Sequence, residues 1–174
     1  MSDDDPVILR PVLEGDLPFF DQFMTDSEAT GAFAWTGWRD PRHWRRGWEE
    51  NALLGTDGGT LLVTAGAESL GFVAWRKVPV WNGGHYWNIG VQLVPAARGR
   101  GAGTRAQQQL VAYLFAHSPV VRIEADTEAG NIAEQRALEK AGFTREGVGR
   151  SVAFRDGQWR DVVHCGILRG EQGV

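Results

Sequence analysis

The sequence predicts a mixed α/β fold in which helices cover both faces of one sheet. Near Thr60 the spacing of apolar residues changes from the period of a helix to the alternation of a strand. Beyond residue 85, strand-like and helix-like segments follow one another with short turns between them. The 174 residues contain no repeat and no long linker, which favours a single domain over residues 1–174. We expect the acidic start, residues 1–6, to be a disordered tail.

The first half of the chain predicts one strand, two helices and a hairpin. Their expected bounds are 7–11 for the strand, 17–24 and 43–54 for the helices, and 60–65 and 70–76 for the hairpin. Asp16 is a suitable N-cap for the first helix, and Gly55 is a suitable end for the second. A loop rich in Trp and Gly, residues 31–38, lies between the two helices.

The second half predicts four more strands and two more helices. The strands are expected at 85–94, 120–126, 144–154 and 160–168, and the helices at 104–117 and 132–141. Gly90 lies inside the first of these strands, where a glycine suggests a bulge or the close approach of another backbone. The turn Asp156-Gly157 joins the last two strands.

Composition excludes several classes of protein. A net charge of −4 argues against a nucleic-acid binder, which normally carries a basic surface. No window is apolar enough for a membrane span, so we expect no membrane partner. Cys165 is the one cysteine, which rules out an intramolecular disulfide and suits a reducing compartment, so we expect a cytoplasmic protein. The four histidines are scattered and no C-x-x-C occurs, so we expect no metal site.

A glycine-rich turn between a strand and a helix is the most informative stretch. It consists of Arg98, Gly99, Arg100, Gly101, Ala102, Gly103 and Thr104. A helix N-terminus presents unpaired N–H groups and partial positive charge, and glycines allow the backbone to approach a phosphate closely. The lysine of the Walker pattern is missing, and the spacing differs from the dinucleotide fingerprint. The turn therefore predicts a different phosphate-bearing cofactor.

The arrangement R-x-x-G-x-G resembles the acyl-CoA loop of the GNAT superfamily of N-acetyltransferases, more closely its ribosomal-protein-acetylase (RimJ/RimL-like) branch. It is found here as Arg98, Gly101 and Gly103, with Asn131 and residues 139–143 (EKAGF) at family-like separations. The resemblance implies a mostly antiparallel central sheet of about seven strands, splayed at the cofactor cleft, with about four helices on both faces. It also implies transfer of an acetyl group from acetyl-CoA to a primary amine by direct attack in a ternary complex.

The resemblance further implies where the coenzyme lies. Its pantetheine arm would enter the gap between strand 85–94 and the strand that ends near Asp126, with backbone contacts from Gln92, Leu93 and Val94. Residues 98–104 would hold the pyrophosphate. A backbone N–H freed by the bulge near residues 91–93 would stabilise the oxyanion. Arg136, with Lys140 on the same helix face, could reach the phosphates, although solvated helix charges are the commoner explanation.

Three residues are candidates for the chemistry. Asn131 would contact the pantetheine arm, and it could also form an N-cap and a capping box with Glu134. Glu134 stands where the branch often has a serine near the coenzyme sulfur, and the sequence favours a capping role for it over a catalytic one. For the general base there are four candidates, and Asp126 and Glu128, beside the end of a strand lining the cleft, are better placed than Glu124 and His85. Leu138 stands where many members have a tyrosine acid.

The acceptor amine is the least determined part. In the family its pocket is formed by the first helices and the last hairpin, which here suggest Trp35, Trp38 and Phe154 as wall residues. The acceptor is expected to be a protein N-terminal amine or a small-molecule amine such as an antibiotic, and the protein could form a homodimer. An acyl-CoA-binding module without catalysis is the alternative function.

Overall fold

The computed structural model describes residues 6–171. All of the expected tail except Pro6 lies outside the described residues. The helices and strands are, in chain order, β1 (Val7–Pro11), α1 (Leu17–Thr25), α2 (Ser27–Thr30), α3 (His43–Asn51), β2 (Leu54–Gly55), β3 (Gly58–Ala65), β4 (Glu68–Pro79), β5 (His85–Leu93), α4 (Ala102–His117), β6 (Arg122–Glu128), α5 (Ile132–Lys140), β7 (Thr144–Arg155) and β8 (Gln158–Leu168). Short 3₁₀ turns at Glu14–Asp16 and Pro95–Ala97 precede α1 and α4.

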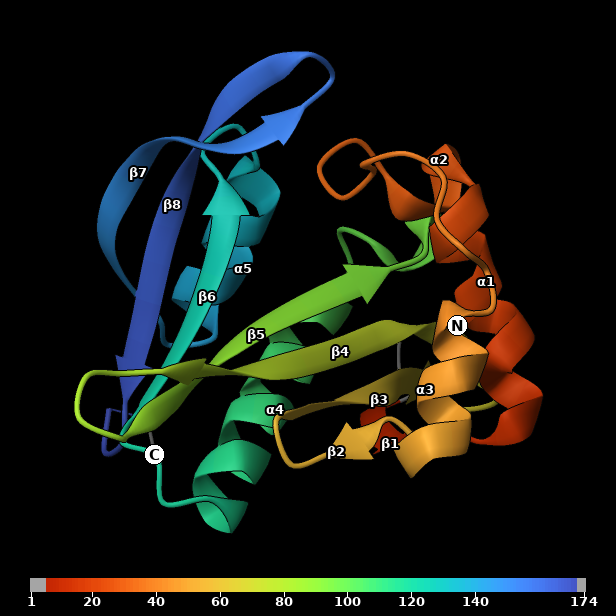
Figure 1. Ribbon diagram of the computed structural model, residues 1–174, viewed down its shortest axis with the longest axis horizontal. Coiled ribbons are helices and arrows are strands. Elements are labelled where there is room, and N and C mark those ends of the chain that lie inside the picture. The colour runs from red at the N-terminus through yellow and green to blue at the C-terminus, as the bar shows by residue number, and fades with distance from the viewer. Residues whose placement is uncertain (1–5, 172–174) are drawn as a thin grey trace.

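The strands form one mixed sheet with the order β1-β3-β4-β5-β6-β8-β7, and β2 pairs with β3 beside this path (Figure 1). Only the β5–β6 pairing is parallel among the described strands. The predicted, mostly antiparallel sheet of seven strands is confirmed, and β2 adds a strand of two residues. All four predicted helices are present. The additional α2 is four residues long and precedes the predicted loop.

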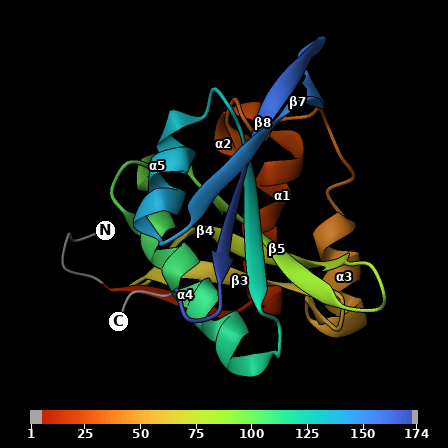
Figure 2. The same cartoon turned by 90° about the vertical axis from the view of Figure 1, so that its left-hand side faces the viewer.

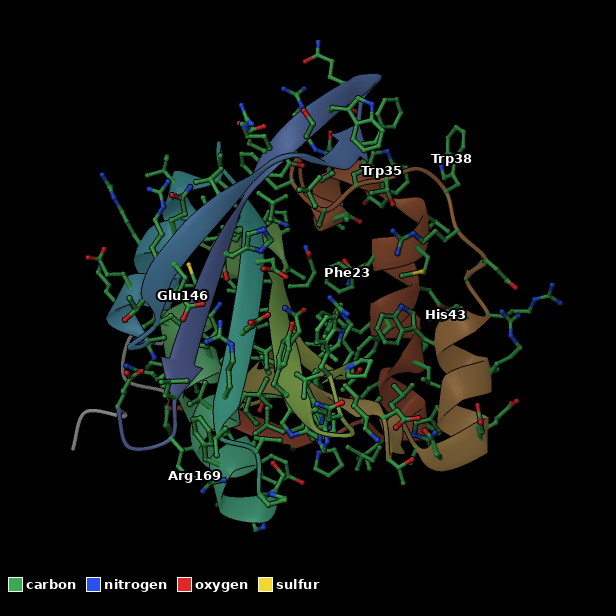
Figure 3. All side chains as sticks on the ribbon, turned by 60° about the vertical axis from the view of Figure 1, so that its left-hand side comes forward. Phe23, Trp35, Trp38, His43, Glu146 and Arg169 are labelled. Carbon is green, nitrogen blue, oxygen red and sulfur yellow. The ribbon has the colours of Figure 1, made fainter. Side chains whose placement is uncertain are left out.

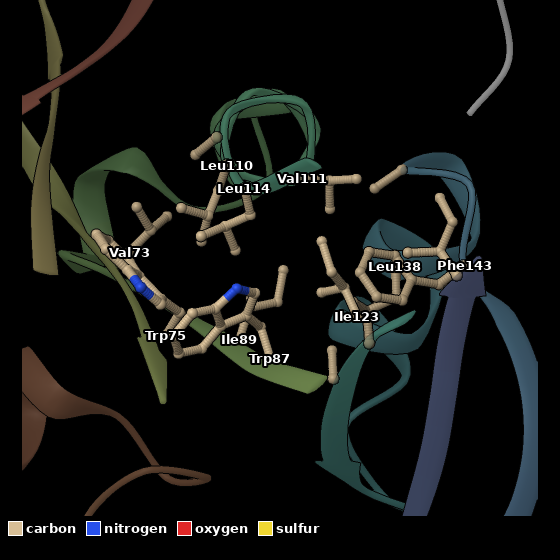
Figure 4. Close-up of a cluster of buried hydrophobic side chains, with 14 of the residues drawn as sticks. Val73, Trp75, Trp87, Ile89, Leu110, Val111, Leu114, Ile123, Leu138 and Phe143 are labelled. Atoms are coloured by element: carbon tan, nitrogen blue, oxygen red, sulfur yellow. The ribbon is translucent and has the colours of Figure 1, made fainter. Parts of the chain in front are cut away.

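Helices cover both faces of the sheet, as the sequence predicts. Helices α4 and α5 lie on one side, and α1 and α3 lie on the other (Figure 2). The larger apolar cluster lies between α4 and the central strands (Figure 4), with Leu110, Ile123 and Leu138 fully buried in it. A second cluster packs Phe20 of α1 against Leu62 of β3. These clusters hold the strands that carry the site.

The sheet splits between β5 and β6. The two strands are paired only from Trp87 with Ile123 to Ile89 with Ala125, and beyond that point they part (Figure 1). The predicted splay is therefore confirmed. The bulge expected at Gly90 is wrong, because β4 and β5 keep one register from end to end. A side chain at Gly90 would meet open space, so this glycine lies beside the split without distorting its strand.

Helix α1 begins at Leu17 after the N-cap residue Asp16, as predicted, but the capping hydrogen bond is missing, and the predicted end of α3 is wrong. Asp16 does not cap α1 with its side chain; its carboxylate accepts the Leu13 N–H at 2.8 Å and holds Arg10. Helix α3 stops at Asn51 rather than near Gly55, since Ala52 and Leu53 take positive φ angles of 55° and 60°. This turn lets Leu53 pack against the second cluster.

Two observations bear on partners. None of the helices in residues 6–171 combines the length and the apolar character that crossing a membrane requires. In the same residues, no three His, Cys, Asp or Glu side chains gather closely enough to hold a metal ion.

Candidate active site

The glycine-rich turn forms an uncapped helix N-terminus. Gly101 is the N-cap of α4 with φ of 78°, and Gly99 has φ of 75°, angles that residues with a Cβ rarely adopt. Gly101 offers no side chain to its helix, so the first N–H groups of Ala102, Gly103 and Thr104 have no intrahelical partner. The first helical hydrogen bond runs from Arg105 N–H to Gly101 O at 3.1 Å. The turn therefore presents backbone donors suited to an anion.

The Arg98 side chain has a different position from the expected one. Its Nη2 donates to the carbonyls of Ala29 at 2.7 Å and Thr30 at 3.2 Å, and its Nε donates to Leu93 O at 3.0 Å. Gln92 also donates to Thr30 O, at 2.6 Å. Arg98 thus links the glycine-rich turn to the end of α2, and its guanidinium is used within the protein.

Along β5, the main-chain groups of alternate residues point toward the split, and those of the residues between them point toward β4. Val94 N–H donates to Leu70 O at 2.9 Å, so this residue is turned toward β4. Hydrogen-bonded pairs alternate along an antiparallel ladder, so Gln92 also faces β4, whereas Val91 and Leu93 face the split. Leu93 is therefore the one residue of the predicted trio whose main chain faces the split, and Val91, which the sequence predicted only as part of the oxyanion-stabilising stretch 91–93, faces it too.

The side of β5, β6 and β8 opposite α4 and α5, which we call the polar face, carries the acidic side chains of β6. Ile123 and Ala125 are buried against α4, so their neighbours in β6 point the other way. The face comprises Asn88, Gly90, Glu124, Asp126, Glu128 and His164. Asp126 is the first residue of β6 beyond its last pair with β5.

Asp126 has two uncharged or weakly basic partners. Asn88 Nδ2 donates to its Oδ2 at 2.8 Å, and His164 Nδ1 lies 2.7 Å from its Oδ1. The Asp126 side chain is 31% exposed and the His164 side chain 44%, so solvent and a substrate can reach the pair. A carboxylate that holds and orients an imidazole is a common arrangement for proton transfer near neutral pH.

The other candidate bases have partners that occupy them. Arg155 donates to both oxygens of Glu128, and this ion pair lowers the pKa of Glu128. Arg122 donates to Glu124 at 2.6 Å. His85 packs edge-on against Trp87, at the opposite end of β5 from the split. Asp126 is therefore the candidate whose environment is most suitable.

Asn131 and Glu134 lie at the start of α5. Asn131 is the N-cap, and its side chain accepts the Glu134 N–H at 3.3 Å, as predicted. The capping box is wrong, because the Asn131 N–H donates to Glu128 O and the Glu134 carboxylate instead accepts from Gln107 of α4. Burial raises the pKa of Glu134, more than the Gln107 hydrogen bond lowers it.

The four remaining predicted binding residues, Arg136, Trp35, Trp38 and Phe154, lie in three parts of the fold. Arg136 lines a cavity of about 520 Å³ between α5 and the β7–β8 pair. Trp35 and Trp38 line a cavity of about 360 Å³ with residues 25–27, and Trp38 points outward from the loop (Figure 3). Phe154 packs edge-on against Trp159 in the last hairpin. Trp35 and Trp38 therefore lie together, with their rings edge-on and the centroids 6.5 Å apart, whereas Arg136 and Phe154 belong to two other parts of the fold.

Several residues around the site escaped the sequence reasoning. His164 and Asn88 meet Asp126 through strand pairing, and each lies 38 residues from it in the chain. Gln107 is only 1% exposed, and its Oε1 has no hydrogen-bond partner among the described residues. Asn88 and Gln107 are polar residues inside apolar segments, and this pattern is the sequence signal that could have identified them. Phe33 stacks on Arg155, with the guanidinium carbon 5.6 Å from the ring centroid.

Comparison with known proteins agrees with this architecture. The profile of the acetyltransferase (GNAT) domain matches residues 7–144. The chain is 40% identical over 80 residues to "Probable N-acetyltransferase YjcK" of Bacillus subtilis (strain 168). That alignment spans 46% of this chain and 44% of the relative, so the chain covers less than half of the curated relative it matches.

Solved structures share the fold over nearly the whole chain. A spermidine N-acetyltransferase from Vibrio cholerae, in complex with CoA and spermine, superposes with a TM-score of 0.82 at 16% identity, covering 95% of this chain and 96% of that one. A ribosomal-protein-alanine N-acetyltransferase from Brucella melitensis gives 0.79 at 22% identity, with 93% and 99% covered. At these identities the likeness shows the fold. Together with the domain match, it establishes that this chain belongs to the GNAT acetyltransferase family.

Proposed function

We propose that this protein transfers an acetyl group from acetyl-CoA to a primary amine by direct attack. One observation carries the proposal: β5 parts from β6 beside the uncapped, glycine-rich start of α4. This leaves an unpaired strand edge next to a set of backbone anion donors. A linear molecule with a peptide-like arm and a diphosphate matches both features.

The residues present fit coenzyme A. The N–H groups of Ala102, Gly103 and Thr104 would hold the diphosphate, and the absence of a Cβ at Gly99 and Gly101 keeps the approach open. The bound coenzyme would supply the acetyl group as an activated thioester. Val91 and Leu93 would hydrogen-bond its amide groups, and the Val91 N–H is the suitable donor for the developing oxyanion.

Asp126 and His164 would take the proton that the acceptor ammonium must lose before attack. Asn88 holds one carboxylate oxygen, and the other oxygen orients the imidazole. A base oriented in this way contributes on the order of 10²–10⁴-fold to a proton-transfer step.

Glu134 would return a proton to the departing thiolate. Burial favours its neutral form, which is the form that can donate. Leu138, at the position of the usual tyrosine acid, is fully buried and cannot serve.

The decisive experiment measures acetyl-CoA binding by calorimetry and thiol release across a panel of amines. Asp126→Asn should lower kcat by on the order of 10²-fold or more while the Kd for acetyl-CoA stays unchanged. His164→Gln should lower kcat less. Binding without thiol release from any amine would instead favour an acyl-CoA-binding module without catalysis, and failure to bind acetyl-CoA would contradict both.

Finer assignments belong to the same proposal. Membership of the RimJ/RimL-like branch is supported by the R-x-x-G-x-G turn and by the similarity to a ribosomal-protein-alanine acetyltransferase. A single domain over residues 1–174, a cytoplasmic location and a homodimer are the organisation we propose for it. Cys165, buried in β8, suits a reducing compartment.

A further inference from the structure

Three carboxylates around the polar face are already held by arginines. Arg155 donates from Nε and Nη2 to the two oxygens of Glu128, at 2.7 and 2.9 Å, with both side chains only 10% exposed. Arg122 donates to Glu124 at 2.6 Å and to both oxygens of Glu146. A carboxylate neutralised in this way attracts a further ammonium only weakly, and the guanidinium beside it repels one.

Asp126 has no such partner in the described structure: it holds an amide and an imidazole, neither of which carries a permanent positive charge. An ammonium that enters the split therefore meets one carboxylate that an arginine does not neutralise. This carboxylate is also the residue at which the two strands part.

An aromatic ring lies beyond Asp126. Phe33, from the loop after α2, reaches the other half of the sheet, where it stacks on Arg155 and lies 3.6 Å from where a Cβ on Gly130 would be. It remains 45% exposed, so one part of the ring is available to a ligand. Glu128 follows Asp126 by two residues on the same face, which puts Glu128, the residue that Arg155 holds, about 7 Å farther along β6.

We infer that the acceptor is an amine with a single positive charge and a flat apolar group next to it, and that a polyamine is a poor acceptor. This inference rests on the proposed function and specifies its substrate. The ammonium binds at Asp126, and the flat group extends toward the exposed part of the Phe33 ring. A second ammonium on the same molecule would point at Arg155 and lose affinity. A free arylalkylamine and the first residue of a peptide can both carry this chemistry.

The test compares kcat/KM for phenethylamine, tryptamine, propylamine, spermidine and a short peptide that begins with Phe. The kcat/KM for phenethylamine, tryptamine or the peptide should be at least about tenfold higher than that for spermidine. This is the ratio expected from one like-charge contact. The same aromatic acceptors should exceed propylamine. Comparing the peptide with phenethylamine and tryptamine shows whether the acceptor is the first residue of a peptide or a free arylalkylamine. A preference for spermidine, or equal rates for propylamine and the aromatic amines, would overturn the inference.

Arg155 provides a gain-of-function test. Arg155→Gln releases the Glu128 carboxylate and should raise kcat/KM for spermidine severalfold relative to phenethylamine, while Arg155→Lys, which keeps the charge, should not. Lys77→Gln is the control, since it removes a cation paired with Asp57 near the far end of the sheet. An unchanged Kd for acetyl-CoA shows that each variant is folded. If that Kd is intact and Arg155→Gln leaves the ratio unchanged, the inference is wrong although the acetyltransferase function stands.

Discussion

At the scale of single residues, two glycines before α4 adopt backbone conformations that other residues avoid. A side chain at Gly101 would be strained at φ of 78° and would meet Arg105 Nη1 at 2.9 Å. A branched side chain there would also stand among the N–H groups that we assign to the diphosphate. Conformational strain and loss of binding are therefore separate effects, and they can be measured separately.

Gly101→Val should raise the Kd for acetyl-CoA at least about tenfold, which corresponds to about 1.4 kcal/mol. The strain itself should lower the free energy of unfolding by about 1–2 kcal/mol. Gly157→Val is the matched control, because Gly157 has a similar φ of 72° in the distant β7–β8 turn. Calorimetry and urea unfolding should show a similar stability loss in both variants but weaker binding only in the first. Equal binding by the two variants would contradict the assignment of the turn.

The buried Glu134 carboxyl makes stability depend on pH. Its pKa is raised in the folded protein, so the folded state binds a proton more tightly than the unfolded chain. The free energy of unfolding should therefore fall as the pH rises from the ordinary value of 4.5 to the raised pKa, and the loss should be complete above it.

Glu134→Gln should remove this part of the pH dependence while a hydrogen bond between the two amide side chains remains possible. The stability of the variant relative to the wild type should rise with pH over that window. Urea unfolding at a series of pH values measures the difference in the free energy of unfolding between variant and wild type. The contributions of the other titrating groups cancel in this difference. A difference that does not change with pH would show that Glu134 titrates normally.

At the scale of elements, α5 begins at a residue with two proposed tasks. Asn131→Ala should cost about 1 kcal/mol of stability through the lost cap, or roughly 2–4 °C in Tm for a chain of this size. It should also reduce turnover. Asn131→Asp separates the tasks, because an aspartate still caps the helix but has no amide N–H to donate. If Asn131→Asp is fully active and Asn131→Ala is only less stable, then Asn131 serves only as a helix cap and does not contact the coenzyme.

Element order was predictable from the sequence because its signals are local. Strand alternation, helical spacing and turn glycines act within about a dozen residues, so all seven main strands and four longer helices were expected. Contacts between distant segments were not predictable. Arg98 reaches carbonyls 68 and 69 residues away. Its positive charge beside glycines predicted a phosphate contact, whereas tertiary packing turned the side chain toward α2.

The candidate site divides in the same way. The glycine turn and the Asn131 cap are local patterns, and both are present. The Asn88–Asp126–His164 group depends on the registers of β5 with β6 and of β6 with β8, which one sequence does not specify. The orientation of Trp35 and Trp38 was not predictable for a similar reason, because loop 31–38 has no periodicity that would orient them, and their role at the acceptor stays a prediction.

At the scale of the whole molecule, the split leaves the two halves of the sheet joined by few paired strand residues, although the larger apolar cluster extends through both halves. Three residue pairs connect β5 with β6, and the Glu134–Gln107 hydrogen bond connects α5 with α4. A ligand that hydrogen-bonds along the free edge of β5 would act as an additional strand between the halves. Binding should therefore reduce local opening on both sides of the split, in addition to stabilising the folded state by mass action.

Hydrogen exchange measures this coupling directly. With acetyl-CoA at about 100 times its Kd, global stability should rise by about 2.7 kcal/mol. Amides of residues 90–93 and 126–128 should slow more than those of the β3–β4 hairpin, whose ladder is complete without ligand. The slowing should reach α5, because its first turn lies at the open end of the split. If protection rose equally in β3–β4 and beside the split, global stabilisation alone would account for it, and the free edge of β5 would not be the surface that the coenzyme binds.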